Sequence, residues 1–250
     1  MPNTFQTDIH FQSQQYFDQK SSDFNHKYSH HPSFKERYQI WSEYIQRYTQ
    51  NHNKQTLCLD IGCGPGVITT LVSSHGIRTV GIDQSTSMLE LATSSIQQQG
   101  LDSLTKFLCA SVPLPLELET QYTNSADLIV CSSVLEYIAD WQTALRQFHL
   151  LLEPNGILLI SLPNRDSIYR AFERGLKKTP LSNNLYIKYQ HHQFDPGAIN
   201  GQLQELGFSV IDKAFFALPF HNQLSGIFGT NRPEWLATMF LVAAQKSAIP

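Results

Sequence analysis

Leu57-Cys58-Leu59-Asp60-Ile61-Gly62-Cys63-Gly64-Pro65-Gly66-Val67-Ile68 is the stretch from which the fold can be inferred. It opens as a short apolar run of the kind found in strands that are buried on both faces. Three glycines at alternate positions then interrupt the run, and a helical pattern of apolar residues follows. A strand, a glycine turn and a helix N-terminus in this order predict a ligand cradle. The reason is that glycine lets a ligand approach the backbone, while the first N–H groups of the helix have no partner within it.

The glycine spacing distinguishes two kinds of adenosine ligand. A dinucleotide fingerprint is G-x-G-x-x-G, whereas this loop reads G-x-G-x-G and follows an acid, Asp60. The pattern D-x-G-x-G-x-G at 60–66 resembles the first motif of the class I S-adenosylmethionine-dependent methyltransferases. The resemblance implies that Gly62, Cys63 and Gly64 hold the methionine end of S-adenosylmethionine, and that Asp60 positions the ammonium group of this cofactor.

Composition narrows the class of protein. The chain has 250 residues, 41% hydrophobic and 16% charged, which is typical of a globular protein with one large domain or two small ones. A net charge of −3 gives no general attraction to nucleic acid or acidic lipid. Four cysteines without C-x-x-C spacing predict reduced thiols, and no apolar run approaches about 18 residues. We therefore expect a cytoplasmic protein without nucleic-acid partners or membrane insertion; its oligomeric state stays open.

The second predicted strand also ends in an acid. Residues 79–83 form a short apolar run that closes with Asp83, and an acid at this position can accept both ribose hydroxyls in a dehydrogenase or a methyltransferase. Gln84 follows and is placed to line the adenine edge. Ser87 and Glu90 have capping-box spacing, which predicts the start of a helix. Within that helix, Met88 resembles the family position that packs on the adenine face.

The third predicted strand, 105–109, departs from the family pattern at its end. Relatives carry an aspartate there that accepts a hydrogen bond from the adenine amino group, whereas this chain has Ala110 and Ser111. Backbone groups or the Ser111 hydroxyl are the remaining candidates for that contact. A polar connection over 117–124 leads to the fourth predicted strand, 126–131.

The segment after the fourth strand resembles the family's L-E-H motif. It reads Ser132-Ser133-Val134-Leu135-Glu136-Tyr137-Ile138, with tyrosine in place of the histidine. The resemblance places Cys131 and Ser132 at the cofactor and Tyr137 at the substrate. The next helix is predicted to be capped by Asp140, and the five residues 152–156 match a family turn before a fifth strand.

Residues 164–195 form the region that varies most in the family, and we expect this insertion to shape the substrate pocket. Its basic residues are interpreted either as a solvated helix face or as partners of an acidic substrate group. They are Arg165, Arg170, Arg174, Lys177 and Lys178. His191 and His192 are the candidate general bases; the alternative is that they are ordinary surface residues.

The N-terminal region, 1–50, is expected to form an arm and a helical lid before a methyltransferase domain at 51–250. A stripe of apolar residues predicts an amphipathic helix that packs on the core, at positions Phe34, Tyr38, Trp41, Ile45 and Tyr48. Tyr16 and Tyr28 fall in a stretch that resembles the family's lid, which implies substrate contacts. The resemblance also implies that Arg37 reaches the cofactor carboxylate, unless it is a solvated surface residue.

Alternating strands and helices over 56–162 predict an α/β fold, a doubly wound and mostly parallel seven-stranded sheet of Rossmann-like methyltransferase type. Its antiparallel terminal hairpin is predicted at 208–216 and 238–244. The expected reaction is in-line methyl transfer, with S-adenosylhomocysteine as product. The acceptor would be an O, N or C nucleophile, including a carboxylate, on a small, partly apolar metabolite or a peptide terminus. The alternatives are an inert methyltransferase-like binding module and an NAD(P)-binding oxidoreductase.

Overall fold

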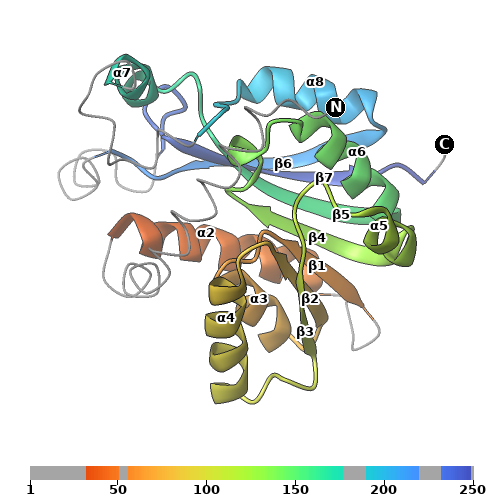
Figure 1. Cartoon of the computed structure of the whole chain (residues 1–250). Coiled ribbons are helices and arrows are strands. Elements are labelled where there is room, and N and C mark those ends of the chain that lie inside the picture. The colour runs from red at the N-terminus through yellow and green to blue at the C-terminus, as the bar shows by residue number, and fades with distance from the viewer. Residues whose placement is uncertain (1–31, 51–55, 177–189, 220–231, 249–250) are drawn as a thin grey trace, which may run out of the picture.

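The computed structural model describes residues 32–50, 56–176, 190–219 and 232–248, which form a seven-stranded sheet covered by helices on both faces (Figure 1). The strand order is β3-β2-β1-β4-β5-β7-β6, with β7 antiparallel to both of its neighbours and the other pairs parallel. The strands are β1 (Leu57–Ile61), β2 (Arg78–Asp83), β3 (Thr105–Cys109), β4 (Ala126–Ser132), β5 (Leu152–Pro163), β6 (Phe208–Phe216) and β7 (Met239–Lys246). This arrangement confirms the predicted fold class and the terminal antiparallel pair.

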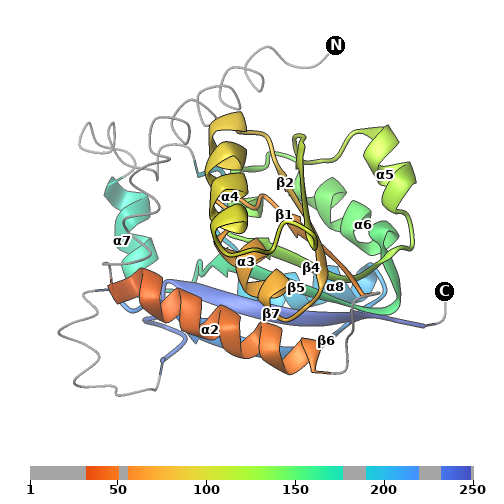
Figure 2. The ribbon, with the colours of Figure 1, turned by 90° about the horizontal axis from the view of Figure 1, so that it is seen from below.

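The helices divide between the two faces of the sheet, as the view from below makes clear (Figure 2). Residues of α2 and α3 belong to one hydrophobic cluster, and residues of α5, α6 and α8 belong to the other. The helical elements are α2 (Pro32–Thr49), α3 (Val67–Ser74), α4 (Thr86–Gln98), α5 (Leu116–Tyr122), the 3-10 turn η1 (Leu135–Tyr137), α6 (Trp141–Leu151), α7 (Ile168–Leu176) and α8 (Pro196–Glu205). None of the described helices is long and apolar enough to cross a membrane.

Alternation along β4 explains why the central strands have continuous apolar sequences. Leu128 and Val130 pack in the cluster with α2 and α3, whereas Ile129 and Cys131 pack in the cluster with α6 and α8. Successive side chains of a strand point to opposite faces, so a strand covered on both sides needs apolar residues at every position. The polar ends of these strands are therefore free to build a site.

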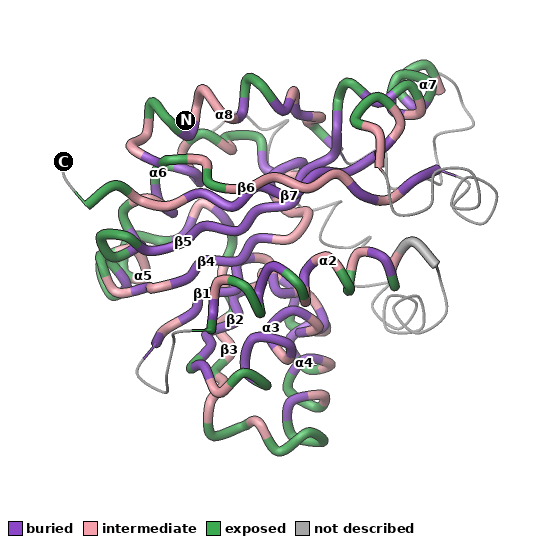
Figure 3. The backbone as a smooth tube through the Cα atoms, turned by 180° about the vertical axis from the view of Figure 1, so that it is seen from behind, coloured by how far each residue is buried: buried purple, intermediate pink, exposed green. Residues whose placement is uncertain are grey.

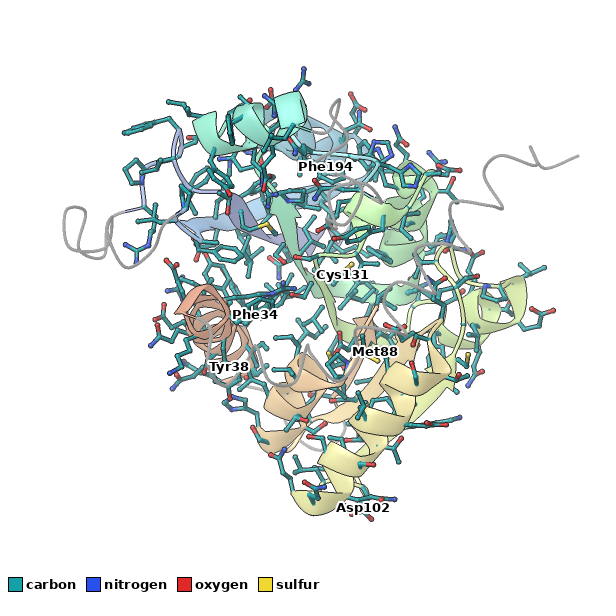
Figure 4. The ribbon with its side chains drawn as sticks, turned by 60° about the vertical axis from the view of Figure 1, so that its left-hand side comes forward. Phe34, Tyr38, Met88, Asp102, Cys131 and Phe194 are labelled. Atoms are coloured by element: carbon teal, nitrogen blue, oxygen red, sulfur yellow. The ribbon has the colours of Figure 1, made fainter. Side chains whose placement is uncertain are left out.

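Helix α2 bears out the predicted core packing over its second half only. Trp41 and Ile45 are fully buried, but Tyr38 is 41% exposed and Phe34 is half-buried. Figure 4 labels Phe34 and Tyr38 on this helix. The apolar stripe therefore continues beyond the part of the helix where its residues are fully buried.

Two local expectations need correction, and a third is confirmed. Helix α4 begins at Thr86 and is capped by Ser85, whose hydroxyl accepts the Met88 N–H at 3.1 Å, so the Ser87–Glu90 spacing does not mark the cap. The polar connection at 117–124 contains α5, whose Glu119 accepts a hydrogen bond from the buried Gln147 amide. The turn expected at 152–156 is present as a break in the pairing of β5 with β4, and Asn155 there has the left-handed φ of 67° that asparagine tolerates.

Candidate functional site

A cavity opens at the carboxyl ends of β1, β2 and β4, where ligands bind in open parallel sheets. In Figure 4, Met88 and Cys131 lie near the middle of the molecule, and Asp102 lies at its far end. The cavity is lined by Arg37, Asp60, Gly62, Cys63, Gly64, Pro65, Val67, Ile68, Asp83, Gln84, Ser85, Met88, Ala110, Val112, Ser132, Ser133, Val134, Tyr137 and Ile138. Segments from α2 to η1 therefore meet at one place.

Two loop glycines serve different purposes. Gly62 (φ 70°) packs so closely that an added Cβ would lie 2.2 Å from Val134 Cγ2. Gly64 (φ 51°) lines the cavity, and an added Cβ there would meet no atom within 4 Å. Both need glycine for their left-handed backbone. Gly62 is required by packing, whereas the space beside Gly64 is available to a ligand.

Asp83 fastens the glycine loop to the end of β2. Its Oδ2 accepts the Gly64 N–H at 2.8 Å and its Oδ1 accepts the Ser85 N–H at 2.9 Å. The carbonyl of Ile82 accepts two further loop N–H groups, from Gly62 and Cys63. The loop is thus held in shape by β2 before any ligand binds.

Asp60 is a second acid on the same wall. It is 1% exposed, and its Oδ2 accepts the Thr69 hydroxyl at 2.5 Å. Burial raises the pKa of Asp60 to about 7, the Thr69 hydrogen bond lowers it, and the neighbouring Asp83 charge raises it further. Because a cation beside the pair would favour the ionised form, this wall suits a positively charged ligand group.

Arg37 supplies positive charge to the cavity from α2. Its Nη2 donates to the carbonyl oxygen of Ser132 at 3.0 Å and to the Ser132 hydroxyl at 2.6 Å. Its Nε is buried and has no hydrogen-bond partner among the described residues. Two acids and one guanidinium suit a ligand that carries both an ammonium and a carboxylate. The methionine end of S-adenosylmethionine has this charge pattern, so the residues present fit that group.

Most predicted cofactor residues line the cavity, but two lie outside it. Gln84, Met88 and Ala110 are at its wall. Ser111 is exposed and is absent from the lining. The Cys131 side chain packs in the core on the other face of β4, where burial raises the pKa of its thiol.

The predicted catalytic histidines also lie outside the cavity lining. The backbone N–H groups of His191 and His192 donate to the carbonyl of Glu136 at 2.7 and 3.1 Å. His192 Nε2 lies 3.3 Å from the carbonyl oxygen of Ala139, and its ring packs near Trp141. This places the 190–194 segment against η1. Tyr137, predicted at the substrate, lines the cavity, while Tyr16 and Tyr28 lie outside the described residues.

Glu136 is the functional candidate that sequence reasoning missed. It is 2% exposed and, like the two histidines, it is absent from the cavity lining. Its Oε2 has no hydrogen-bond partner among the residues described. Burial raises the pKa of Glu136 to about 7, although the charges of Arg37 and Arg170 lower it. A lone acid between apolar residues in V-L-E-Y-I was the available signal. In the part of the chain that the structure covers, no three His, Cys, Asp or Glu side chains could hold a metal ion.

The fold and this cavity define a class I S-adenosylmethionine-dependent methyltransferase. The family described as "Methyltransferase domain" matches residues 33–213, and the chain belongs to it. Its cofactor is S-adenosylmethionine. The match supports neither the dinucleotide-binding nor the inert alternative.

Curated relatives cover part of the chain. It is 29% identical over 133 residues to a ubiquinone biosynthesis O-methyltransferase of Coxiella burnetii (53% of each chain). It is 31% identical over 153 residues to the protein of that name from Histophilus somni (59% of this chain and 63% of that one). The chain thus spans about half to two thirds of the length of these relatives.

Solved structures share the fold over nearly the whole chain. The magnesium protoporphyrin IX methyltransferase of Synechocystis PCC 6803, with bound SAH, superposes with a TM-score of 0.69 at 15% identity. The superposition covers 96% of this chain and 100% of that one.

Proposed function

We propose that this methyltransferase acts on a hydroxyl oxygen of a small, partly apolar acceptor. The curated relatives are named for O-methyl transfer in ubiquinone biosynthesis, which supports oxygen as the accepting atom. Tyr137, Val134 and Ile138 supply apolar surface to the cavity, which supports an acceptor with an apolar body.

The observation that carries the proposal is the buried carboxyl of Glu136. A hydroxyl acceptor needs a base, whereas a carboxylate or a neutral amine attacks unaided. Glu136 is itself absent from the cavity lining, but its Oε2 has no hydrogen-bond partner within the described structure, and the flanking Val134 and Tyr137 line the cavity. A pKa of about 7 is close to optimal for a group that takes a proton near neutral pH.

In this proposal the cavity residues hold the cofactor by its charges. Arg37 pairs with the carboxylate, Asp60 faces the ammonium group, and Asp83 accepts the ribose hydroxyls. Met88 and Gln84 border the adenine. When bound, S-adenosylmethionine supplies a methyl group activated by its sulfonium. Alignment and exclusion of water are then the main tasks of the protein.

Glu136 completes the proton balance. With the cofactor bound, Glu136 would take the proton that the acceptor hydroxyl gives up when its oxygen is methylated. Arg37 and Arg170 keep part of the Glu136 population ionised, because both charges lower its pKa. The backbone N–H groups of His191 and His192 hold the Glu136 carbonyl and so fix the turn that carries the carboxyl.

The test compares Glu136→Gln with Glu117→Gln, an exposed glutamate on α5. Methyl transfer from labelled S-adenosylmethionine would be measured with a phenol, a carboxylic acid and an amine of similar size. We expect methylation of the phenol, and a kcat that is lowered about 100- to 10,000-fold in Glu136→Gln only. Calorimetric affinity for S-adenosylhomocysteine should not change. Preferred methylation of the amine or the acid, or wild-type kcat in Glu136→Gln, would refute the proposal.

A further inference from the structure

Helix α7 buries one charged pair and exposes two large apolar residues. Arg170 and Glu173 are 5% and 7% exposed and form an ion pair at 2.6 Å. Ile168 and Phe172, four residues apart on one helix face, are 63% and 62% exposed. Figure 3 shows α7 at the edge of the molecule, with much of its length coloured as exposed. This is the reverse of an ordinary surface helix.

The buried charges fix this orientation of the helix. Arg170 Nε donates to the carbonyl of Thr238 at 3.1 Å, and its Nη2 lies 3.2 Å from the sulfur of Met239. These contacts join α7 to the start of β7. Rotating the helix to bury Ile168 and Phe172 would break them and expose an ion pair that is now buried. The outward apolar face is therefore built into the packing.

A third large apolar side chain extends the face. Trp235 is 51% exposed, and its carbonyl accepts the Ile168 N–H at 2.9 Å. Of the seven large apolar side chains exposed in the described part of the chain, these three lie together. We call Ile168, Phe172 and Trp235 the α7 patch. Single exposed apolar residues are common, but a contiguous group marks a contact surface.

The segment 165–178, which includes two residues of the α7 patch, is basic in sequence. It holds five arginines and lysines against Asp166 and Glu173. Among the described residues, Arg165 and Arg174 are exposed, and Asp166 and Glu234 are the exposed acids nearby in the sequence. Arg174 donates to the uncharged oxygens of Arg165 and Gln193.

We propose that the α7 patch docks the protein on the surface of a lipid bilayer that contains anionic lipids. Helices that bind at the boundary between lipid headgroups and acyl chains typically carry tryptophan, phenylalanine and isoleucine beside arginine and lysine. A convex helix face also suits a soft lipid surface better than a preformed groove would. The net charge of −3 does not oppose this, because the attraction is local.

The position of the α7 patch gives the docking a use that goes beyond the proposed function. Arg170, on the inner face of the same helix, acts electrostatically on Glu136. In this proposal, docking would bring an acceptor dissolved in the bilayer toward the helix that carries this charge.

Vesicle co-sedimentation of the full chain tests the docking without any acceptor, so its outcome is independent of the proposed O-methyl transfer. Vesicles of phosphatidylcholine with about 30 mol % phosphatidylglycerol would be compared with pure phosphatidylcholine. We expect binding to the anionic vesicles, reduced about tenfold or more in Ile168→Glu/Phe172→Glu. Leu116→Glu is the matched control, because Leu116 is 72% exposed on α5, away from α7 (Figure 1).

Contrary outcomes refute the proposal, and two of them identify another occupant of the α7 patch. Absence of wild-type binding to anionic vesicles, or equal binding by the double variant, refutes the proposal. If the double variant instead melts at lower temperature and the wild type ignores vesicles, another segment of this chain covers the face. If sedimentation velocity shows a wild-type dimer that the double variant dissolves, a second copy covers it. Either result overturns docking on lipid.

Discussion

Gly62 and Gly64 share a left-handed backbone, yet alanine should affect them differently. In Gly62→Ala the new methyl collides with Val134, so we expect a loss of about 2–4 kcal/mol in the free energy of unfolding. In Gly64→Ala the methyl enters open cavity space, and the loss should be about 1 kcal/mol. Affinity for S-adenosylhomocysteine should then fall about tenfold or more. Urea unfolding and calorimetry measure the two effects.

Gly76→Ala is the control for this comparison. Gly76 (φ 79°) has open space at its Cβ position, like Gly64, but it lies outside the cavity lining. It should therefore reproduce the stability loss of Gly64→Ala and keep wild-type affinity. Equal affinity in Gly64→Ala and Gly76→Ala would mean that no ligand lies against Gly64.

Two buried acids predict an unusual dependence of stability on pH. Burial raises the pKa of Asp60 from 3.8 and that of Glu136 from 4.5, each to about 7. Between about pH 4 and pH 7 the native state therefore binds more protons than the unfolded chain does. The free energy of unfolding should fall as the pH rises through this interval and level off above it.

Glu136→Gln removes one of these two groups, so its fall in stability between about pH 5 and pH 7 should be shallower than that of the wild type. Chemical denaturation at several pH values would measure the slopes. Glu117→Gln, exposed on α5, should keep the wild-type slope. Parallel wild-type and Glu136→Gln curves would show that the carboxyl keeps an ordinary pKa.

At the scale of single residues, the sequence predicted the site residues that belong to motifs of fixed spacing. Asp60, Gly64 and Asp83 fall at strand ends, so strand prediction alone brings them to one edge of the sheet. Arg37 lies 95 positions before its partner Ser132, and only the family resemblance suggested it. Glu136 was missed because the 190–194 segment, whose backbone N–H groups bond its carbonyl, is distant in sequence.

Among the elements, β5 is tied to the segment before β7 by one buried amide. Asn164 Nδ2 donates to the carbonyls of Glu234 and Ala237 at 2.7 and 2.9 Å, and its Oδ1 accepts the Asp166 N–H at 3.0 Å. Asn164→Ala should lower the free energy of unfolding by about 2–4 kcal/mol, because it leaves buried backbone groups unpaired.

Urea unfolding measures this cost, and Gln202→Ala is its control. Gln202 makes an exposed hydrogen bond to Glu205 within α8, so its loss should stay within about 0.5 kcal/mol. Matching losses in the two variants would mean that Asn164 does not hold the segment.

Elements with strong local signals were predicted within a few residues, and those made by tertiary contacts were not. The apolar strands and the Asp195-Pro196 start of α8 are examples of the first kind. Helix α5 is an example of the second, because its polar sequence is held by Gln147, whose amide also bonds both backbone groups of Leu114. The bulge in β5 likewise depends on its pairing with β4.

For the molecule as a whole, cofactor binding should stabilise the native state. S-adenosylhomocysteine at about 100 times its Kd adds about 2.7 kcal/mol. In a protein of this size that corresponds to a rise of about 5–10 °C in Tm. Thermal unfolding would measure the rise, with NAD at the same concentration as the control. A rise with NAD and none with S-adenosylhomocysteine would contradict the cofactor assignment.

The overall topology followed from alternating strands and helices because parallel strands need crossovers. The acceptor did not follow, since methyl transfer to a reactive oxygen, nitrogen or carbon demands alignment more than any fixed residue. The inverted helix α7 was also beyond sequence reasoning. The sequence leaves its basic residues as either a solvated face or partners of an acidic substrate group, whereas Arg170 is buried against the start of β7.

The place of β7 in the sheet has a consequence for biosynthesis. This strand, residues 239–246, bonds to β5 on one side and β6 on the other, although β6 precedes it in the chain. While the polypeptide leaves the ribosome, β6 emerges first and has no edge to join until β7 follows. The first five strands can assemble during translation, but the edge of β5 that pairs with β7 stays unpaired until β7 has emerged. Nascent chains halted before residue 239 should therefore be the species that chaperones retain.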